Sequence, residues 1–212
     1  MTFSIITIPN GKWRQNCYLV SDDSTGLALV IDPGSEAVTI RFKLSHYSLT
    51  PVAILNTHAH FDHIGAVADL IQYYKIPFYL NQADVNLMKQ ANLYKFLFDS
   101  KESIVIPEFS HELSNHDENL QLGGFVVSIL STPGHTKGSI CLQIGANLFS
   151  GDTLLPDSLG RTDLPGGNKF ELAKSVALLR NLPAETKVWP GHGQSFPLGS
   201  LWEKLAQVGG ET

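Results

Sequence analysis

The segment 57–63 constrains this chain more than any other stretch of its sequence. It reads Thr-His-Ala-His-Phe-Asp-His and stands between a short apolar run and a helical pattern. Residues two apart in an extended segment point the same way, so His58 and His60 can bind one cation together. Asp62 and His63 stand where the chain turns into the helix and can face a second position. The segment therefore predicts a metal site at a strand-to-helix junction.

Three more candidate ligands stand where apolar runs end. His135 and His192 each follow a Pro-Gly pair, and Asp152 follows a Ser-Gly pair. A glycine at such a place lets the backbone pass close to a crowded centre. Imidazole and carboxylate ligands without thiolates suit Zn, Fe or Mn. A plain turn or capping role stays open for each of these residues. The remaining histidines lack such a context, and we expect them at the surface: His46, His111 and His116.

The rest of the chain reads as short strands and helices. Apolar runs predict strands at 3–8, 16–21, 27–31, 52–55, 76–80, 126–130, 139–144, 147–150 and 187–189. Helical spacing predicts helices at 35–47, 64–74, 84–98, 168–182 and 198–208, the fourth capped by its first residue, an asparagine. The strands come in antiparallel-looking groups rather than in a βαβ alternation. This order favours an α+β fold in which two packed sheets are covered outside by helices.

The two halves of the chain repeat one pattern, in which a hairpin leads to an aspartate. This residue is Asp32 in the first half and Asp152 in the second. No Ser- or Pro-rich linker divides the chain, so we expect one domain over residues 1–212. Cys17 and Cys141 stand among apolar neighbours, and we expect both to be buried free thiols in strands.

Charge and hydropathy disfavour several classes of partner. The 212 residues carry a formal net charge of -5, whereas nucleic-acid-binding proteins usually present a basic surface. No run of 18 apolar residues is present, so no membrane span is expected. The first ten residues lack a basic region, an apolar run and a cleavage site, which favours a cytoplasmic location. The oligomeric state stays open.

The candidate ligands, in their order and spacing along nearly the whole chain, resemble the ligand set of the metallo-β-lactamase superfamily. The resemblance implies an αββα four-layer sandwich with two metals at one edge between the sheets. It also implies the ligands: His58, His60 and His135 for one metal, Asp62, His63 and His192 for the second, and Asp152 as the bridge. Flavodiiron-type members have a carboxylate where His60 stands, which disfavours that branch. Asp32 matches an acidic position near the site, where it would orient a ligand or serve only as a turn residue.

Several segments are most similar to the short form of the hydroxyacylglutathione hydrolase (glyoxalase II) group. They are residues 16–19, 31–34, 132–139, 151–154 and 160–167. The Gly-Arg-Thr-Asp stretch at 160–163 also occurs in persulfide dioxygenases and does not separate the two groups. Only residues 193–212 follow the last ligand in this sequence, so we expect no helical domain with basic residues for glutathione. Its absence weakens the expectation of glutathione specificity more than that of hydrolysis.

This resemblance implies hydrolysis of a small-molecule thioester, such as a glutathione derivative. Two divalent metal ions, zinc in the first place and Fe or Mn as alternatives, would lower the pKa of a shared water towards about 7. The resulting metal-bridging hydroxide attacks the thioester carbonyl, and Asp62 is placed to accept its remaining proton. A leaving thiol with a pKa of about 8.5 departs without a strong general acid. Arg161 is a candidate for binding a substrate carboxylate, or it forms only an ion pair with Asp157 or Asp163.

Three other functions stay open for the same residues. A mononuclear iron persulfide dioxygenase would use only His58, His135 and Asp152. A phosphodiesterase or nuclease is disfavoured by the acidic charge balance and the lack of a basic arm. A catalytically silent metal-binding module would keep the ligands without turnover. A serine nucleophile is not expected, because the sequence has no Gly-x-Ser-x-Gly elbow around Ser139.

Overall fold

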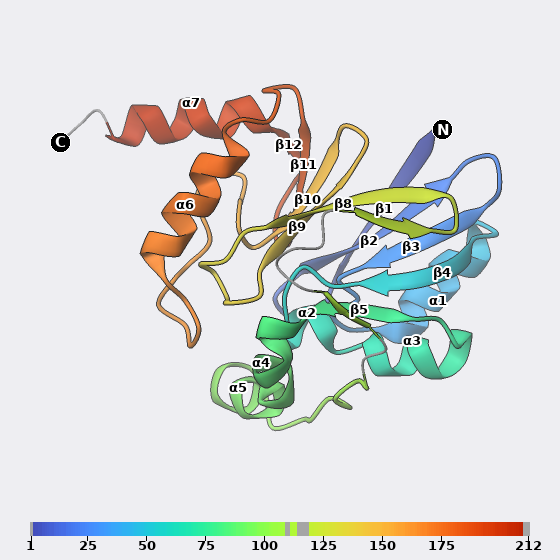
Figure 1. Cartoon of the computed structure of the whole chain (residues 1–212). Helices are drawn as coiled ribbons and strands as arrows, with labels where there is room; N and C mark the ends of the chain where they lie inside the picture. Colours follow the sequence, from blue (N-terminus) through green and yellow to red (C-terminus); the bar gives the residue numbers. More distant parts are fainter. Residues whose placement is uncertain (1, 109–110, 114–118, 210–212) are drawn as a thin grey trace.

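The computed structural model describes residues 2–108, 111–113 and 119–209, and it places two six-stranded sheets face to face (Figure 1). The first sheet has the order β1 (Phe3–Asn10), β2 (Gln15–Asp22), β3 (Leu27–Ile31), β4 (Thr50–Leu55), β5 (Phe78–Asn81) and β6 (His111–Leu113). The second has the order β12 (Phe196–Pro197), β11 (Lys187–Pro190), β10 (Asn147–Gly151), β9 (Ile140–Ile144), β8 (Phe125–Ser131) and β7 (Asn119–Leu122).

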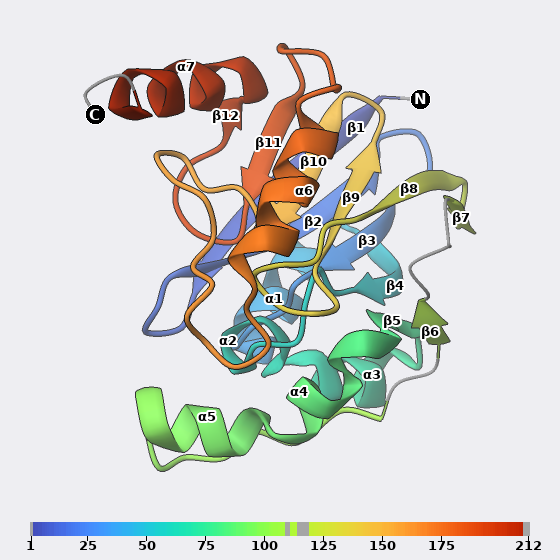
Figure 2. The same ribbon diagram turned by 60° about the vertical axis from the view of Figure 1, so that its left-hand side comes forward.

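Helices cover the outer faces of both sheets, as Figures 1 and 2 show. The first sheet is covered by α1 (Ala37–His46), α2 (Phe61–Ile64) and α3 (Val67–Tyr74). The second is covered by α6 (Lys169–Leu179) and α7 (Leu198–Gly209). A short 3-10 turn (Gln82–Asp84) leads into α4 (Val85–Lys89) and α5 (Ala91–Phe98), which lie at one end of the sandwich in Figure 2.

Alternating side chains along β2 explain why the layers stack. Cys17 and Leu19 pack outward in the cluster that contains the helices of the first sheet. Tyr18 and Val20 point the other way and pack in the cluster between the two sheets. A third cluster joins β10 and β11 to α6 and α7, with Leu148 at its centre. These apolar layers hold four layers of structure together, and the αββα sandwich is confirmed.

The prediction that the strands pair as antiparallel groups is wrong in part. β3 pairs with β4, β4 with β5, β5 with β6 and β10 with β11 in parallel. Helices stand in all four of these connections: α1 between β3 and β4, α2 with α3 between β4 and β5, α4 with α5 between β5 and β6, and α6 between β10 and β11. A crossover helix allows the chain to return and run in the same direction. Period-two patterning marks a strand but carries no information on the direction of its partner.

Several helices and strands differ in their bounds from the predicted ones. The helix expected over 84–98 is interrupted at Gln90, which ends α4 and precedes α5. Strands β6, β7 and β12 lie outside the predicted strands, because these segments of 3, 4 and 2 residues contain no continuous apolar run. Asn168 caps α6 as expected, accepting hydrogen bonds from the backbone N–H groups of Phe170 and Glu171. No helix in the described ranges is long and apolar enough to cross a membrane.

The predicted residue environments agree with the structure where it describes them. Cys17 and Cys141 are buried free thiols in β2 and β9. His46 and His111 are exposed, and His111 stacks on Tyr79. His116 lies outside the described residues.

The repeat between the two halves is real and brings the candidate ligands to one place. In each half an antiparallel hairpin (β2–β3, β9–β10) is followed by a helix and a parallel strand (α1–β4, α6–β11). Asp32 directly follows β3, and Asp152 directly follows β10, so they occupy equivalent positions. Parallel strands end at the same edge of a sheet. The residues after β3, β4, β10 and β11 therefore gather at one end of the sandwich.

Candidate metal centre

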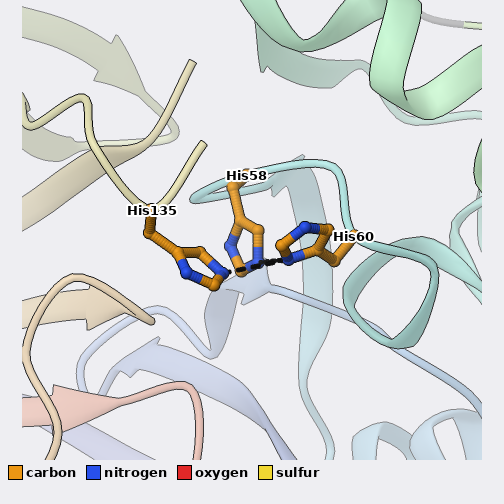
Figure 3. Close-up of side chains that lie close together, drawn as sticks. All are labelled: His58, His60 and His135. Carbon is orange, nitrogen blue, oxygen red and sulfur yellow. Dashed lines mark hydrogen bonds between the residues drawn. The ribbon is translucent and has the colours of Figure 1, made fainter. Parts of the chain in front are cut away.

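Three imidazoles form the first group of ligand atoms (Figure 3). His58 and His60 follow β4, and His135 follows β8. The Nε2 atoms of His58 and His135 each lie 3.0 Å from Nδ1 of His60, and the three rings converge in Figure 3. The two-residue spacing thus turns His58 and His60 to the same side, as the sequence predicts. Three nitrogens within 4.8 Å of one another can hold one metal ion.

A second group consists of Asp62, His63 and His192. Asp62 and His63 lie on α2, and His192 follows β11. Oδ2 of Asp62 lies 3.4 Å from Nε2 of His192 and 4.0 Å from Nε2 of His63. The side chain of His63 is fully buried, whereas those of Asp62 and His192 are 20% and 29% exposed. This group therefore has a carboxylate ligand and faces solvent on one side.

Asp152 lies between the two groups. Its Oδ1 is 3.5 Å from Nε2 of His63, and its Oδ2 is 3.6 Å from Nε2 of both His135 and His192. Oδ1 of Asp152 and Nε2 of His63 are buried and have no hydrogen-bond partner. A buried polar atom without a partner costs about 1–3 kcal/mol, and a cation between these two atoms would satisfy both. The residues present therefore fit a pair of divalent metal ions that share Asp152.

Backbone carbonyls select the histidine tautomers. Nδ1 of His135 lies 2.8 Å from the carbonyl oxygen of Arg161, and Nδ1 of His192 lies 3.1 Å from that of Trp13. A carbonyl oxygen only accepts, so Nδ1 carries the proton in both rings. Nε2 then presents its lone pair to the cluster, which is the form that binds a metal ion. The same contacts fix the orientation of both rings.

Asp32 orients the second group from behind. Its buried Oδ2 lies 3.0 Å from Nδ1 of His63 and accepts from the Thr57 hydroxyl at 2.6 Å, while its Oδ1 accepts from the Thr57 N–H at 2.7 Å. Asp32 has a φ of 48°, a left-handed conformation that aspartate tolerates better than most residues. It is thus a turn residue whose carboxylate also holds His63 with Nε2 towards the cluster. This geometry agrees with the orienting role that the resemblance implies.

The cluster mixes neutral imidazoles with ionised carboxylates. Burial first, and neighbouring imidazoles second, lower the pKa of His58 well below its usual range and that of His60 to about 3. Burial opposes ionisation of Asp62 and Asp152, but the surrounding histidines outweigh it and lower the pKa of both carboxyls. Burial would also lower the pKa of His63, but nearby carboxylates, Asp152 first, raise it to about 9. Neutral imidazole and ionised carboxylate are the forms that bind metal, so His58, His60 and the two carboxylates are ready to bind an ion, whereas His63 has to release a proton when it does.

The comparisons with known proteins agree with this geometry. A family profile for the metallo-β-lactamase superfamily matches residues 10–192. The chain belongs to this superfamily. A probable metallo-hydrolase of Bacillus subtilis, YqgX, is 40% identical over 190 residues, which cover 88% of each chain. The hydroxyacylglutathione hydrolase GloC of Haemophilus influenzae is 32% identical, over 92% of this chain and 93% of GloC.

Solved structures of the superfamily superpose closely on this chain. The B3 metallo-β-lactamase BLEG-1 has a TM-score of 0.88 and 35% identity, covering 94% of this chain and 97% of BLEG-1. A di-iron-bound form of TTHA1623 has a TM-score of 0.85 and 37% identity, covering 94% and 98%. ETHE1 from Myxococcus xanthus has a TM-score of 0.76 and 28% identity, covering 100% and 86%.

The glycines before the ligands serve two different purposes in this superfamily member. A Cβ on Gly191 would overlap Oδ1 of Asp152 and the ring of His63, so this glycine lets β11 approach the centre, as predicted. Gly134 has a φ of 139°, and a Cβ there would overlap the backbone of Leu172 in α6. The close approach at Gly134 is therefore to a helix rather than to the metal centre.

Sequence reasoning missed Asp84. This buried carboxylate accepts from the N–H of Ala59 at 3.0 Å and from the Thr136 hydroxyl at 2.7 Å through Oδ2. Its Oδ1 accepts from the N–H of Gly138 at 2.7 Å. Asp84 therefore joins the segment that carries His58 to the one that carries the His135 ring. A single aspartate at the start of an expected helix carries no signal of this role.

The cluster opens into a cavity at one end of the sandwich. His60, Asp62, His135, Asp152 and His192 line its floor. Arg161 also lines the cavity, and its side chain is 59% exposed. Nε and Nη2 of Arg161 donate to the two carboxylate oxygens of Asp163 at 2.8 and 2.7 Å. Of the two acids considered, Asp163 is thus the partner of Arg161, while Asp157 pairs with Lys204.

Proposed function

We propose that this chain is a metal-dependent hydrolase that cleaves thioester bonds, of the hydroxyacylglutathione hydrolase type. One observation carries the proposal: two groups of three ligands share Asp152, and two buried atoms between them have no partner without a cation. The similarity to a probable metallo-hydrolase and to GloC supports hydrolysis and, less directly, a thioester substrate.

The ligand assignment follows the two groups. His58, His60 and His135 would hold one metal ion, Asp62, His63 and His192 the second, and Asp152 both. Bound divalent ions, zinc as the first expectation with iron or manganese as alternatives, would lower the pKa of a water molecule and polarise the substrate carbonyl. The hydrogen bonds that orient the ligand side chains leave the metal-binding atom of each ligand free to bind the ion.

Two side chains at the cavity act on the substrate in this proposal. Asp62 is ionised and lines the cavity, so a carboxylate oxygen of Asp62 accepts the proton of the attacking water. Arg161 at the exposed rim binds a carboxylate of the substrate by exchanging Asp163 for it. The leaving thiol has a pKa of about 8.5, so it departs as a thiolate without a proton from an acid of the protein.

A mononuclear dioxygenase is the weaker proposal for this site. It would use His58, His135 and Asp152 and would leave the second group without a role. That group is complete, and its His63 is oriented by a dedicated buried carboxylate. These contacts favour a site that holds two metal ions.

A panel of small thioesters tests the proposal. Protein purified without chelator is assayed for thiol release, and the metal content of the same sample is measured. Hydrolysis that rises with metal content towards two ions per chain supports the proposal. Metal-loaded protein that leaves every thioester intact would overturn it. Oxygen consumption with a persulfide would then favour the dioxygenase.

A further inference from the structure

The cavity above the ligand cluster has a polar floor and apolar walls. The floor consists of the histidines and aspartates of the metal centre. The walls come from three separate parts of the chain: the β1–β2 connection, α4 with α5, and the loop after β10. Their apolar side chains include Trp13, Leu87, Tyr94, Phe98, Leu164 and Pro165. A group bound against the metals therefore meets apolar surface on several sides.

Part of this apolar surface is uncovered. The side chains of Trp13 and Phe98 are 48% and 49% exposed, although both line the cavity. Large exposed apolar surfaces beside a polar rim mark binding sites more often than surfaces without a role. A ligand that covers Trp13 and Phe98 would gain binding free energy in proportion to the apolar area removed from water. The apolar walls of the cavity therefore favour the binding of an apolar ligand.

The lining offers little to a charged acyl group. Among the lining residues that the structure describes, Arg161 is the one lysine or arginine, and its Nε and Nη2 donate to Asp163. A charged acyl group would have to displace Asp163 from Arg161 to gain a partner there, which is the exchange proposed above for a substrate carboxylate. Selection between acyl groups by charge is therefore weak in this cavity.

A second cavity suits the other part of a thioester. It shares Trp13, Phe61 and Asp62 with the first cavity. More than half of its remaining lining residues are polar, and they carry charges of both signs, Lys95 and Glu102 among them. Amide-rich and charged thiol carriers match such a surface. The first cavity, which contains the metal centre, therefore suits an apolar acyl group, and the second, which meets it at Asp62, suits a polar carrier.

We infer that the substrate is a thioester of an apolar carboxylic acid, whose alkyl or aromatic acyl chain lies between Trp13, Leu87 and Phe98. The inference rests on the proposed thioester hydrolysis for its reaction and on the cavity walls for its binding. Water adds its oxygen to the acyl carbon, the C–S bond breaks, and the products are the apolar acid and a thiol. A compact polar acyl group such as a hydroxyacyl group leaves the walls unused.

Binding without turnover tests the subsite by itself. S-alkyl thioethers of N-acetylcysteamine, from ethyl to octyl, are titrated calorimetrically into the metal-loaded chain. The expected affinity rises about fourfold for each added methylene, which corresponds to about 0.8 kcal/mol of burial. An affinity that does not change with chain length would overturn the inference.

A matched pair of variants locates the subsite. Phe98 and Phe96 both lie on α5, and they are 49% and 59% exposed, but only Phe98 lines the cavity. Over two added methylenes, the gain in affinity should be at least twofold smaller in Phe98→Ala than in the unaltered chain. Phe96→Ala should keep the gain of the unaltered chain. Equal effects of the two variants would contradict the placement.

Kinetics separate this inference from the proposed function. Acyl thioesters from acetyl to octanoyl are compared on two thiols, glutathione and N-acetylcysteamine. A kcat/KM that rises with acyl length on both thiols supports the inference. Hydrolysis at a rate set by the thiol alone would overturn the inference and keep the proposed function. Absence of hydrolysis together with the expected series of affinities would keep the apolar subsite and overturn the proposed function.

Discussion

The two ligand groups of the metal centre differ in chemistry and in exposure. The first has three imidazole ligands, His58, His60 and His135, of which His58 and His135 are buried. The second combines a carboxylate with two imidazoles, and its Asp62 and His192 side chains are 20% and 29% exposed. The first group is thus built to hold a metal ion, while the second is also placed to handle protons and water.

The support behind the two groups differs as well. Asp84 joins the two chain segments of the first group through backbone N–H groups and a hydroxyl. The second group is supported by Asp32, which contacts the ligand His63 itself. The geometry of the first site therefore depends on hydrogen bonds that join its two loops. The geometry of the second depends on a carboxylate that contacts the ring of one ligand. Substitutions can separate the two sites on this basis.

Replacing Asp152 should have the largest effect, because this side chain reaches both groups. Asp152→Ala should lose both metal ions and lower kcat/KM by about a thousandfold or more, since metal ions contribute several kcal/mol to such reactions. Metal analysis and thioester assays check this. Asp157→Ala, in the same loop but paired with Lys204, is the control and should keep both metals. Full metal content in Asp152→Ala would show that the ligand assignment is wrong at its centre.

Asp62→Ala should affect the second site alone. We expect about one metal ion per chain and a fall in kcat of about a hundredfold, because Asp62 is both a ligand and the proton acceptor. Asp23→Ala, an exposed aspartate in the turn between β2 and β3, is the matched control. Loss of both metal ions in Asp62→Ala would mean that the two sites are not separable. An unchanged kcat would exclude Asp62 as the proton acceptor.

Asp32→Asn should weaken the second metal ion more gently. Asparagine tolerates the left-handed backbone at this position and keeps one oxygen for the Thr57 N–H, but it replaces the oxygen that faces Nδ1 of His63. Affinity for the second metal should fall about 10–100-fold, with the first unchanged. Titration with a chelator measures both affinities. A larger loss of metal affinity at the first site would show that Asp32 acts through Thr57 and His58 instead.

Arg161→Ala should have the smallest effect. If Arg161 binds a substrate carboxylate, KM for acidic thioesters should rise several-fold more than KM for neutral ones, with metal content unchanged. The exposed pair with Asp163 contributes little to stability, so the melting temperature should stay nearly constant. Equal losses for both substrate types together with a lower melting temperature would assign Arg161 a structural role only.

The ligand residues could be predicted from the sequence because their signals are local. Three histidines in one short segment and a Gly-His pair at two strand ends are visible without the fold. The order of the predicted elements indicated two packed sheets covered by helices, and the family resemblance implied the αββα sandwich, but periodicity failed to give the parallel pairing of β3, β4 and β5. Strand direction depends on the crossover that joins two strands, and single-strand patterns do not contain it.

The supporting residues could not be predicted because their partners are distant in sequence. Asp84 contacts Ala59, Thr136 and Gly138, which are 25, 52 and 54 residues away. The apolar walls of the cavity likewise combine the β1–β2 connection with α5 and a loop of the second half. No spacing rule joins such segments. They come together only when the two sheets stack.

The central claim is that one chain holds two metal ions that share Asp152. Elemental analysis of protein purified without chelator tests it most directly, with a parallel sample of Asp62→Ala. A shared Asp152 predicts about two metal ions per chain for the unaltered protein and about one for the variant. A firm value of one ion in the unaltered protein, unchanged after addition of Zn, Fe or Mn, would contradict it.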